Sequence, residues 1–90
     1  MLDQKPTELI REKILKIINL LNIGKVNKAL DSVSSLIIEV PNNALLYNLQ
    51  GACFEANNQL SHSIKSFKKA ISIFPKYTEA LYNLGVVQNK

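Results

Sequence analysis

The side chains best able to do chemistry in this chain are one cysteine and one histidine, and neither lies in a reactive pattern. Cys53 belongs to the apolar stripe of a predicted helix, beside Phe54. No histidine or aspartate lies at a spacing that would make its thiol a nucleophile. His62 has no cysteine, aspartate or glutamate partner at helical spacing, so we do not expect it to hold a metal ion. We interpret Cys53 as a packing residue and His62 as a surface residue.

The carboxylates give no catalytic pattern either. Glu8 and Glu12 share one helix face, but Arg11, Lys13 and Lys16 surround them, which is typical of exposed helix charges. The sequence has no glycine-rich phosphate loop and no histidine in a nucleophile motif. We therefore predict no catalytic residue, no metal site and no cofactor, and we expect that the chain is not an enzyme.

A formal net charge of +4 over 90 residues raises the question of nucleic-acid binding. Arg11 is the only arginine among the eleven basic residues, although phosphate recognition favours the planar guanidinium group. Lys65, Lys68 and Lys69 form a local basic cluster, but no aromatic side chain is interleaved with them to stack on bases. We interpret the cluster as a solvated helix face and expect no nucleic-acid partner.

Length and hydropathy limit the class of protein. Ninety residues make one small domain, and a hydrophobic fraction of 47% is ordinary for a globular protein. No apolar run reaches the roughly 18 residues needed to span a bilayer, and residues 1–6 lack the apolar core of a secretory signal. We expect no membrane association and a cytoplasmic location.

The chain repeats its small and helix-breaking residues every 34 positions. A period in this range indicates helical units that stack into a solenoid. At one of the repeated positions a glycine is replaced by an asparagine one period later. These two residue types most readily take the left-handed backbone at the end of a helix. The matched pairs are Gly24 with Asn58, Ala29 with Ser63, Pro41 with Pro75, and Gly51 with Gly85.

Within one period the hydrophobic spacing predicts two helices. Apolar or small residues recur at three- and four-residue steps from 43 to 56 and again from 60 to 74. The polar residues 57–59 separate the two runs, and Pro75 ends the second. One unit is therefore a helix hairpin.

One unit has a fixed order of residue types, which are an aromatic residue, a glycine, a second aromatic residue, a small residue, a phenylalanine and a proline. These are Tyr47, Gly51, Phe54, Ser63, Phe67 and Pro75. In this order the unit resembles the tetratricopeptide repeat family. Gln50 replaces the leucine of the family pattern, and a serine replaces its first alanine, while Ala70 fits its second small position.

The resemblance implies an all-α domain over residues 1–90, a solenoid of helix hairpins with about five helices. Residues 7–41 are expected to form a degenerate first repeat, because Lys13 and Ile17 stand where the next unit has Tyr47 and Gly51. Residues 44–77 form a full repeat in this interpretation. Residues 78–90 supply the first helix of a third repeat.

The resemblance also implies a binding surface. In such repeats the first helices of successive units line a concave wall, and that groove accepts a partner's helix or extended peptide. Asn48 and Asn83 are candidates for holding a peptide backbone, because an amide offers both a donor and an acceptor. The matching repeat positions predict a wall of Ile14, Ile18, Leu21, Leu45, Asn48, Ala52, Glu55, Glu79, Tyr82, Val86 and Asn89.

We therefore expect a protein-interaction module, a scaffold for a protein or peptide partner. The alternative is that the chain is the N-terminal recruiting segment of a longer enzyme, such as a glycosyltransferase or sulfotransferase-like protein. The last helix carries apolar residues on more than one face, which are Leu81, Leu84, Val86 and Val87. No second helix follows to cover them, so we expect either a fragment of a longer array or association of this helix with a second copy or a partner.

Overall fold

Five α-helices joined by short turns make up residues 4–90, the part described by the computed structural model, in which side chains are described from residue 8 onward. The expected all-α arrangement of helix hairpins is confirmed. The first helix begins at residue 4 and so extends upstream of the repeat expected from residue 7. The helices are α1 (Gln4–Asn22), α2 (Val26–Glu39), α3 (Ala44–Ala56), α4 (Leu60–Ile73) and α5 (Thr78–Gln88).

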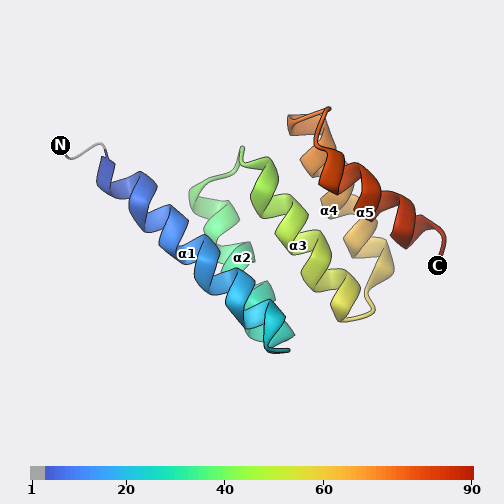
Figure 1. Cartoon of the computed structure of the whole chain (residues 1–90), viewed down its shortest axis with the longest axis horizontal. Helices are drawn as coiled ribbons and strands as arrows, with labels where there is room; N and C mark the ends of the chain where they lie inside the picture. The colour runs from blue at the N-terminus through green and yellow to red at the C-terminus, as the bar shows by residue number, and fades with distance from the viewer. Residues whose placement is uncertain (1–3) are drawn as a thin grey trace.

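The helices form two layers. Figure 1 shows α1, α3 and α5 side by side in the nearer layer, with α2 and α4 behind them. We call the first three the inner helices and the other two the outer helices. Helix α3 packs against both α2 and α4, and α5 packs against α4. The result is a slab of 46 × 29 × 18 Å, the shape expected for hairpins stacked in a row.

The turns inside the two hairpins each contain a residue with a positive φ angle at the equivalent position. Gly24 ends the first inner helix with φ of 85°, and Asn58 stands one period later with φ of 60°. Both values lie in the left-handed region that glycine and asparagine tolerate best, so the sequence pairing of these two residues has a physical basis. The closing N–H···O bonds also match across one period, from Lys25 to Leu20 and from Gln59 to Phe54, each 2.8 Å long.

In the second hairpin, a glycine lies where the inner helix α3 meets the outer helix α4. A Cβ atom at Gly51 would lie 2.5 Å from Cε1 of Phe67, whose ring is fully buried. The hydroxyl of Ser63, also fully buried, donates a 2.8 Å hydrogen bond to the carbonyl of Gly51. The small residues of the repeat pattern therefore lie where the two helices meet, and Ala70 is likewise fully buried.

The first hairpin packs the same positions with the sizes reversed. One period before Gly51 and Phe67 stand Ile17 and Val33, which belong to one buried cluster. Here the inner helix supplies the larger side chain and the outer helix the smaller one. Because cores tolerate exchanges that conserve total volume, this repeat can lack the sequence signature and still form a packed hairpin.

The cysteine and the histidine lie as the sequence predicts. Cys53 is fully buried, and burial raises the pKa of its thiol to about 11, so the thiol stays protonated at neutral pH. His62 is exposed on α4, where its ring centroid lies 5.1 Å from that of Phe54. These environments support packing and surface roles rather than reactivity.

Candidate partner-binding surface

The inner helices present equivalent residues at steps of one period, and most of the residues predicted for a binding wall are accessible. Tyr82 is 71% exposed and Leu45 is 36% exposed, while Glu79 and Asn89 are also exposed. The remaining accessible members are half-buried, and they are Ile14, Ile18, Leu21, Ala52, Glu55 and Val86. The wall residues taken together offer apolar area with one large exposed aromatic side chain.

The charges among these residues are acidic. Glu79 lies in the first turn of α5, where a carboxylate interacts favourably with the helix dipole. Glu55 on α3 is paired with Lys90, whose Nζ lies 3.0 Å from Oε2 of the carboxylate. Glu79 has no such ion pair among the described residues. A basic group of a partner would therefore be attracted to Glu79 more strongly than to Glu55.

The expectation that Asn48 is open to a partner is wrong. Its side chain is 5% exposed, and its Oδ1 accepts a 3.2 Å hydrogen bond from Nδ2 of Asn83. Both asparagines are therefore engaged with each other, and they tie α3 to α5. Asn48 stands one period before Tyr82, so the repeat pattern treats the two positions as equivalent. Asn48 is covered only because α5 packs against this part of α3.

Tyr77, at the start of α5, adds a second contact to this asparagine. The pKa of the Tyr77 hydroxyl is raised, first by burial and second by the negative charge of Glu79, while a hydrogen bond with Asn48 acts in the opposite direction. The hydroxyl is therefore protonated at neutral pH. Asn48 is a structural connection between the second and third units rather than a free amide.

Gln50, the departure from the family leucine, connects three helices. Its Oε1 accepts a 2.9 Å hydrogen bond from Ser66 of α4, and its Nε2 donates to Ser34 of α2 over 3.4 Å. The sequence indicated only a loss of apolar area at this position. The sequence does carry a signal for this role. A polar residue stands in place of an apolar one on a helix with neighbours on both sides, and a polar side chain buried there requires hydrogen-bond partners.

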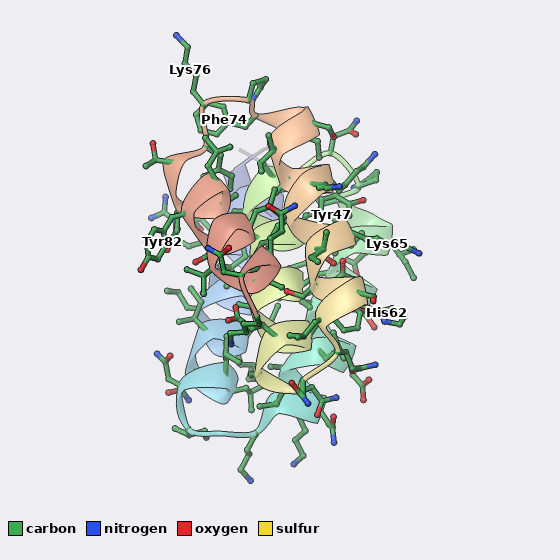
Figure 2. All side chains as sticks on the ribbon, turned by 90° about the vertical axis from the view of Figure 1, so that its right-hand side faces the viewer. Tyr47, His62, Lys65, Phe74, Lys76 and Tyr82 are labelled. Carbon is green, nitrogen blue, oxygen red and sulfur yellow. The ribbon has the colours of Figure 1, made fainter. Side chains whose placement is uncertain are left out.

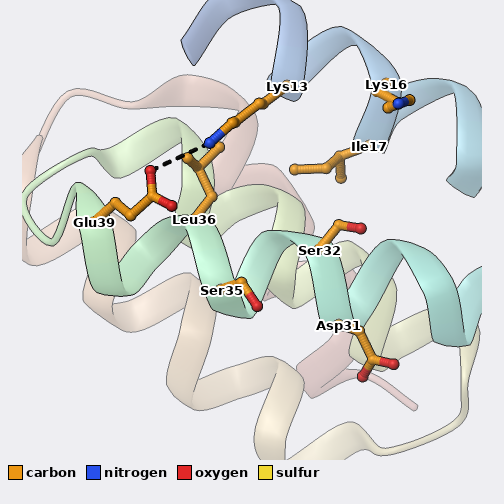
Figure 3. A pocket seen from close by; sticks show the side chains of 8 residues that line it. All are labelled: Lys13, Lys16, Ile17, Asp31, Ser32, Ser35, Leu36 and Glu39. Carbon is orange, nitrogen blue, oxygen red and sulfur yellow. Dashed lines mark hydrogen bonds and ion pairs between the residues drawn. The ribbon is translucent and has the colours of Figure 1, made fainter. Parts of the chain in front are cut away.

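A hollow of about 360 Å³ between α1 and α2 was not expected from the sequence. Ile17 and Leu36 form its apolar floor, and Lys13 Nζ lies 3.3 Å from Oε1 of Glu39 across its rim (Figure 3). The remaining lining residues are Lys16, Asp31, Ser32 and Ser35. Two lysines and two carboxylates balance in charge, so the hollow favours neither anions nor cations.

The basic cluster occupies a different surface from the wall residues. Lys65, Lys68 and Lys69 are exposed on the outer helix α4, and Lys69 Nζ lies 5.8 Å from the ring centroid of Tyr47. Figure 2 shows Lys65 and His62 on one side of the slab and Tyr82 on the opposite side. A partner that contacts Tyr82 would therefore not need to contact the lysines.

Within the described residues, no three side chains of histidine, cysteine, aspartate or glutamate lie together in a group that could hold a metal ion. None of the helices of residues 4–90 combines the length and apolarity needed to cross a bilayer.

Comparison with known proteins gives two kinds of relatives. The peroxisomal targeting signal receptors of Candida albicans and Saccharomyces cerevisiae are each 30% identical to the chain over 60 residues. That region covers 67% of this chain but 10% of each receptor, so the chain spans about a tenth of the receptors that it matches. No protein-family model matches the sequence.

The fold is similar to solved structures of MamA. MamA from Desulfovibrio magneticus RS-1, solved from residue 41 to its end, aligns with a TM-score of 0.82 and 25% identity over 86% of this chain and 44% of that chain. A double mutant of MamA aligns with a TM-score of 0.83 and 24% identity over 89% of this chain and 45% of that chain. These likenesses support the same two-layer arrangement of helix pairs.

Proposed function

We propose that this chain, a tetratricopeptide-type repeat protein of about two and a half repeats, binds a partner's helix or extended peptide along the inner helices α1, α3 and α5. The repeat type rests on the 34-residue period, the five-helix fold and the likeness to MamA and to the targeting-signal receptors. A protein-interaction module is the general function that these relatives support. The position of the groove and the class of its occupant are our inference.

The exposure of Tyr82 is the observation that carries this proposal. A tyrosine that is 71% exposed contributes little to the fold, whereas a partner that covered it would gain a large apolar area. Aromatic residues are enriched in the parts of interfaces that carry most of the binding energy. Leu45 and Ala52 on α3 and Val86 on α5 add further accessible apolar area on the inner helices. The best-suited occupant is therefore an apolar or amphipathic segment.

Glu79 adds a preference in charge. Because it is exposed and unpaired among the described residues while Glu55 is neutralised by Lys90, we expect the occupant to carry a basic residue near its apolar anchor. Such an exposed contact would weaken as the salt concentration rises. The apolar part of the binding free energy would change little.

The alternative, a recruiting segment of a longer enzyme, would keep this binding surface and add chemistry elsewhere. The relatives found are receptors and MamA, which favours a module without catalytic residues or cofactor. A cytoplasmic location is also part of the proposal, and the reduced and buried thiol of Cys53 is compatible with it.

A displayed library of random peptides of about 16 residues, long enough for four helical turns, would test the surface directly. The affinity of the selected peptides would be measured for the unchanged chain, for Tyr82→Ala and for a matched control variant. In the control variant, Lys65, Lys68 and Lys69 are changed to glutamine. We expect at least about tenfold weaker binding to Tyr82→Ala and unchanged binding to the lysine variant. The reverse pattern would move the site to the outer helix α4 and refute the proposal.

A further inference from the structure

The net charge of the chain is concentrated on the outer helix α4 and the turn that follows it. Residues 56–78 contain no aspartate or glutamate and four lysines, which are Lys65, Lys68, Lys69 and Lys76. The other seven basic residues of the chain are matched by seven acidic residues, so this segment carries the whole formal net charge of +4. The positive field of the protein therefore belongs to one part of its surface.

The fold does not use the charges of α4. Lys65, Lys68 and Lys69 are exposed, and none of them forms an ion pair with a described residue. Lys65 stands three and four positions before the other two, a spacing at which like charges on a helix repel one another. This basic cluster is therefore unfavourable for the helix by itself, and an anionic partner would relieve the repulsion.

Beside the basic cluster, part of α3 stays accessible between the two outer helices, because α2 and α4 do not contact each other. We call the half-buried residues Tyr47, Gln50 and Phe54 the outer strip; their spacing of three and four positions places them on one face of α3. Lys69 Nζ lies 5.8 Å from the ring centroid of Tyr47, and the ring of His62 lies 5.1 Å from that of Phe54. The strip thus lies in the middle of the stack, in contact with the side chains of α4.

Helix α2 adds an apolar side chain on the other side of the outer strip. Ser34 of α2 accepts a 3.4 Å hydrogen bond from Gln50, and Ile38 stands about one helical turn further along the same face of α2. Ile38 is 82% exposed, more than any other large hydrophobic residue that the structure describes. A partner that covered Ile38 would gain apolar area close to the outer strip.

These features fit an acidic protein segment better than a nucleic acid or a membrane. The ring of Tyr47 already lies against Lys69, and the ring of Phe54 against His62, so neither is free to stack on a base. A membrane surface is bound through exposed apolar side chains, whereas every exposed residue of α4 is polar. An acidic segment offers carboxylates to the lysines and an apolar side chain to Ile38.

We propose that the basic cluster, the outer strip and Ile38 form a second docking surface, which binds an acidic segment of a partner protein that also carries a large apolar residue. Lys65 and His62 lie on the opposite side of the slab from Tyr82 (Figure 2), so this surface does not depend on the inner-wall proposal. The two surfaces select occupants of opposite charge, because the exposed Glu79 favours a basic residue at the inner wall. One chain can therefore bring two different partners together.

A fluorescein-labelled peptide of repeated Asp-Glu-Leu-Phe units is the probe, and a peptide of repeated Asn-Gln-Leu-Phe units is its matched neutral control. Binding of each peptide to the full 90-residue chain would be followed by fluorescence anisotropy. We expect saturable binding of the acidic peptide and at least about tenfold weaker binding of the neutral one. Added salt should weaken the binding of the acidic peptide, because the lysines are exposed.

Two triple variants separate a defined site from general charge attraction. One changes the basic cluster to glutamine, and the other changes three exposed lysines elsewhere, Lys16, Lys25 and Lys28, which lowers the net charge equally. The first variant should bind the acidic peptide at least about tenfold more weakly, and the second should bind it within about twofold of the unchanged chain. The thermal midpoint of the first should not fall, because repulsion between like charges is removed.

Two single variants test the apolar part of the surface and its separation from the inner wall. Ile38→Ser changes a side chain that is 82% exposed, so the thermal midpoint should stay the same while peptide binding weakens at least about threefold. Tyr82→Ala should leave the binding of the acidic peptide unchanged. Loss of binding in Tyr82→Ala would place the acidic peptide on the inner wall and overturn the proposal.

Other results would also overturn it. Absence of saturable binding, equal binding of the two peptides, or equal loss of binding in the two triple variants would show that α4 has no site for an acidic segment. Tighter binding of a single-stranded oligonucleotide or of phosphatidylserine vesicles through the basic cluster would assign the surface to a nucleic acid or a membrane. Concentration-dependent sedimentation that the first triple variant abolishes would assign it to a second copy.

Discussion

Replacing Gly51 by alanine should destabilise the fold, although alanine is the better helix former. Alanine in place of glycine inside a helix is favourable by about 1 kcal/mol. At this position, however, the new Cβ would lie 2.5, 2.6 and 2.9 Å from three carbon atoms of the Phe67 ring. The ring is fully buried, so it cannot swing away without displacing its neighbours.

The size of the effect follows from these opposing contributions. Overpacking a close-packed core costs about 1 to 3 kcal/mol, and overlap with three ring atoms belongs near the upper end of that range. We therefore expect Gly51→Ala to lower the free energy of unfolding by about 2 kcal/mol. Gly85→Ala should raise it by up to about 1 kcal/mol, because no atom lies within 4 Å of the new methyl group.

Urea unfolding followed by far-UV circular dichroism would measure both variants and a third, Gly51→Ala combined with Phe67→Val. The first hairpin has a valine, Val33, at the position of Phe67. The smaller valine should relieve the overlap, so the destabilising effects of the two substitutions should not be additive. Equal stability of Gly51→Ala and Gly85→Ala would refute the reasoning. It would mean that the ring at Gly51 moves aside at no cost.

Four further outcomes are expected. Asn48→Ala should lower the free energy of unfolding by about 1 to 2 kcal/mol because the hydrogen bond from Asn83 is lost, and an unchanged urea midpoint would contradict this. Ala70→Leu should cost about 1 to 3 kcal/mol by overpacking a fully buried site, measured as a drop in thermal midpoint. Tyr82→Ala should change the free energy of unfolding by less than about 0.5 kcal/mol, so lost peptide binding in this variant could not be attributed to unfolding. Finally, burial raises the pKa of the Cys53 thiol from 9.0 to about 11, so its contribution to stability is complete below pH 9 and is lost as the pH rises to 11. This loss, on the order of 2 to 3 kcal/mol, should be absent in Cys53→Ala when the pH profiles of unfolding of the two proteins are compared.

The sequence by itself determined the elements of this protein and their order. Hydrophobic spacing of three and four residues predicted α3 and α4 with ends within about one residue, because helix periodicity and helix-ending residues act locally. The equivalence of Gly24 and Asn58 was readable for the same reason, since a left-handed backbone is a property of the residue itself. The small residue at Gly51 could likewise be assigned to a helix crossing.

The tertiary structure decided which side chains cover one another. Asn48 stands in the repeat row of an exposed tyrosine, yet the packing of α5 beside α3 buries it. Gln50 is a defect in the family pattern, but Ser34 and Ser66 from two outer helices satisfy its amide. Both outcomes depend on partners 16 or more residues away in the chain, which local spacing does not encode.

The first hairpin shows the same division between sequence and structure most clearly. Its sequence lacks the glycine and phenylalanine of the repeat, yet Ile17 and Val33 at those positions are both buried in one apolar cluster. A core constrains the summed volume of the residues that meet, not the identity of each one. The sequence therefore determines where helices start, turn and repeat, whereas the contact between two helices determines which pairs of sizes fill the space between them.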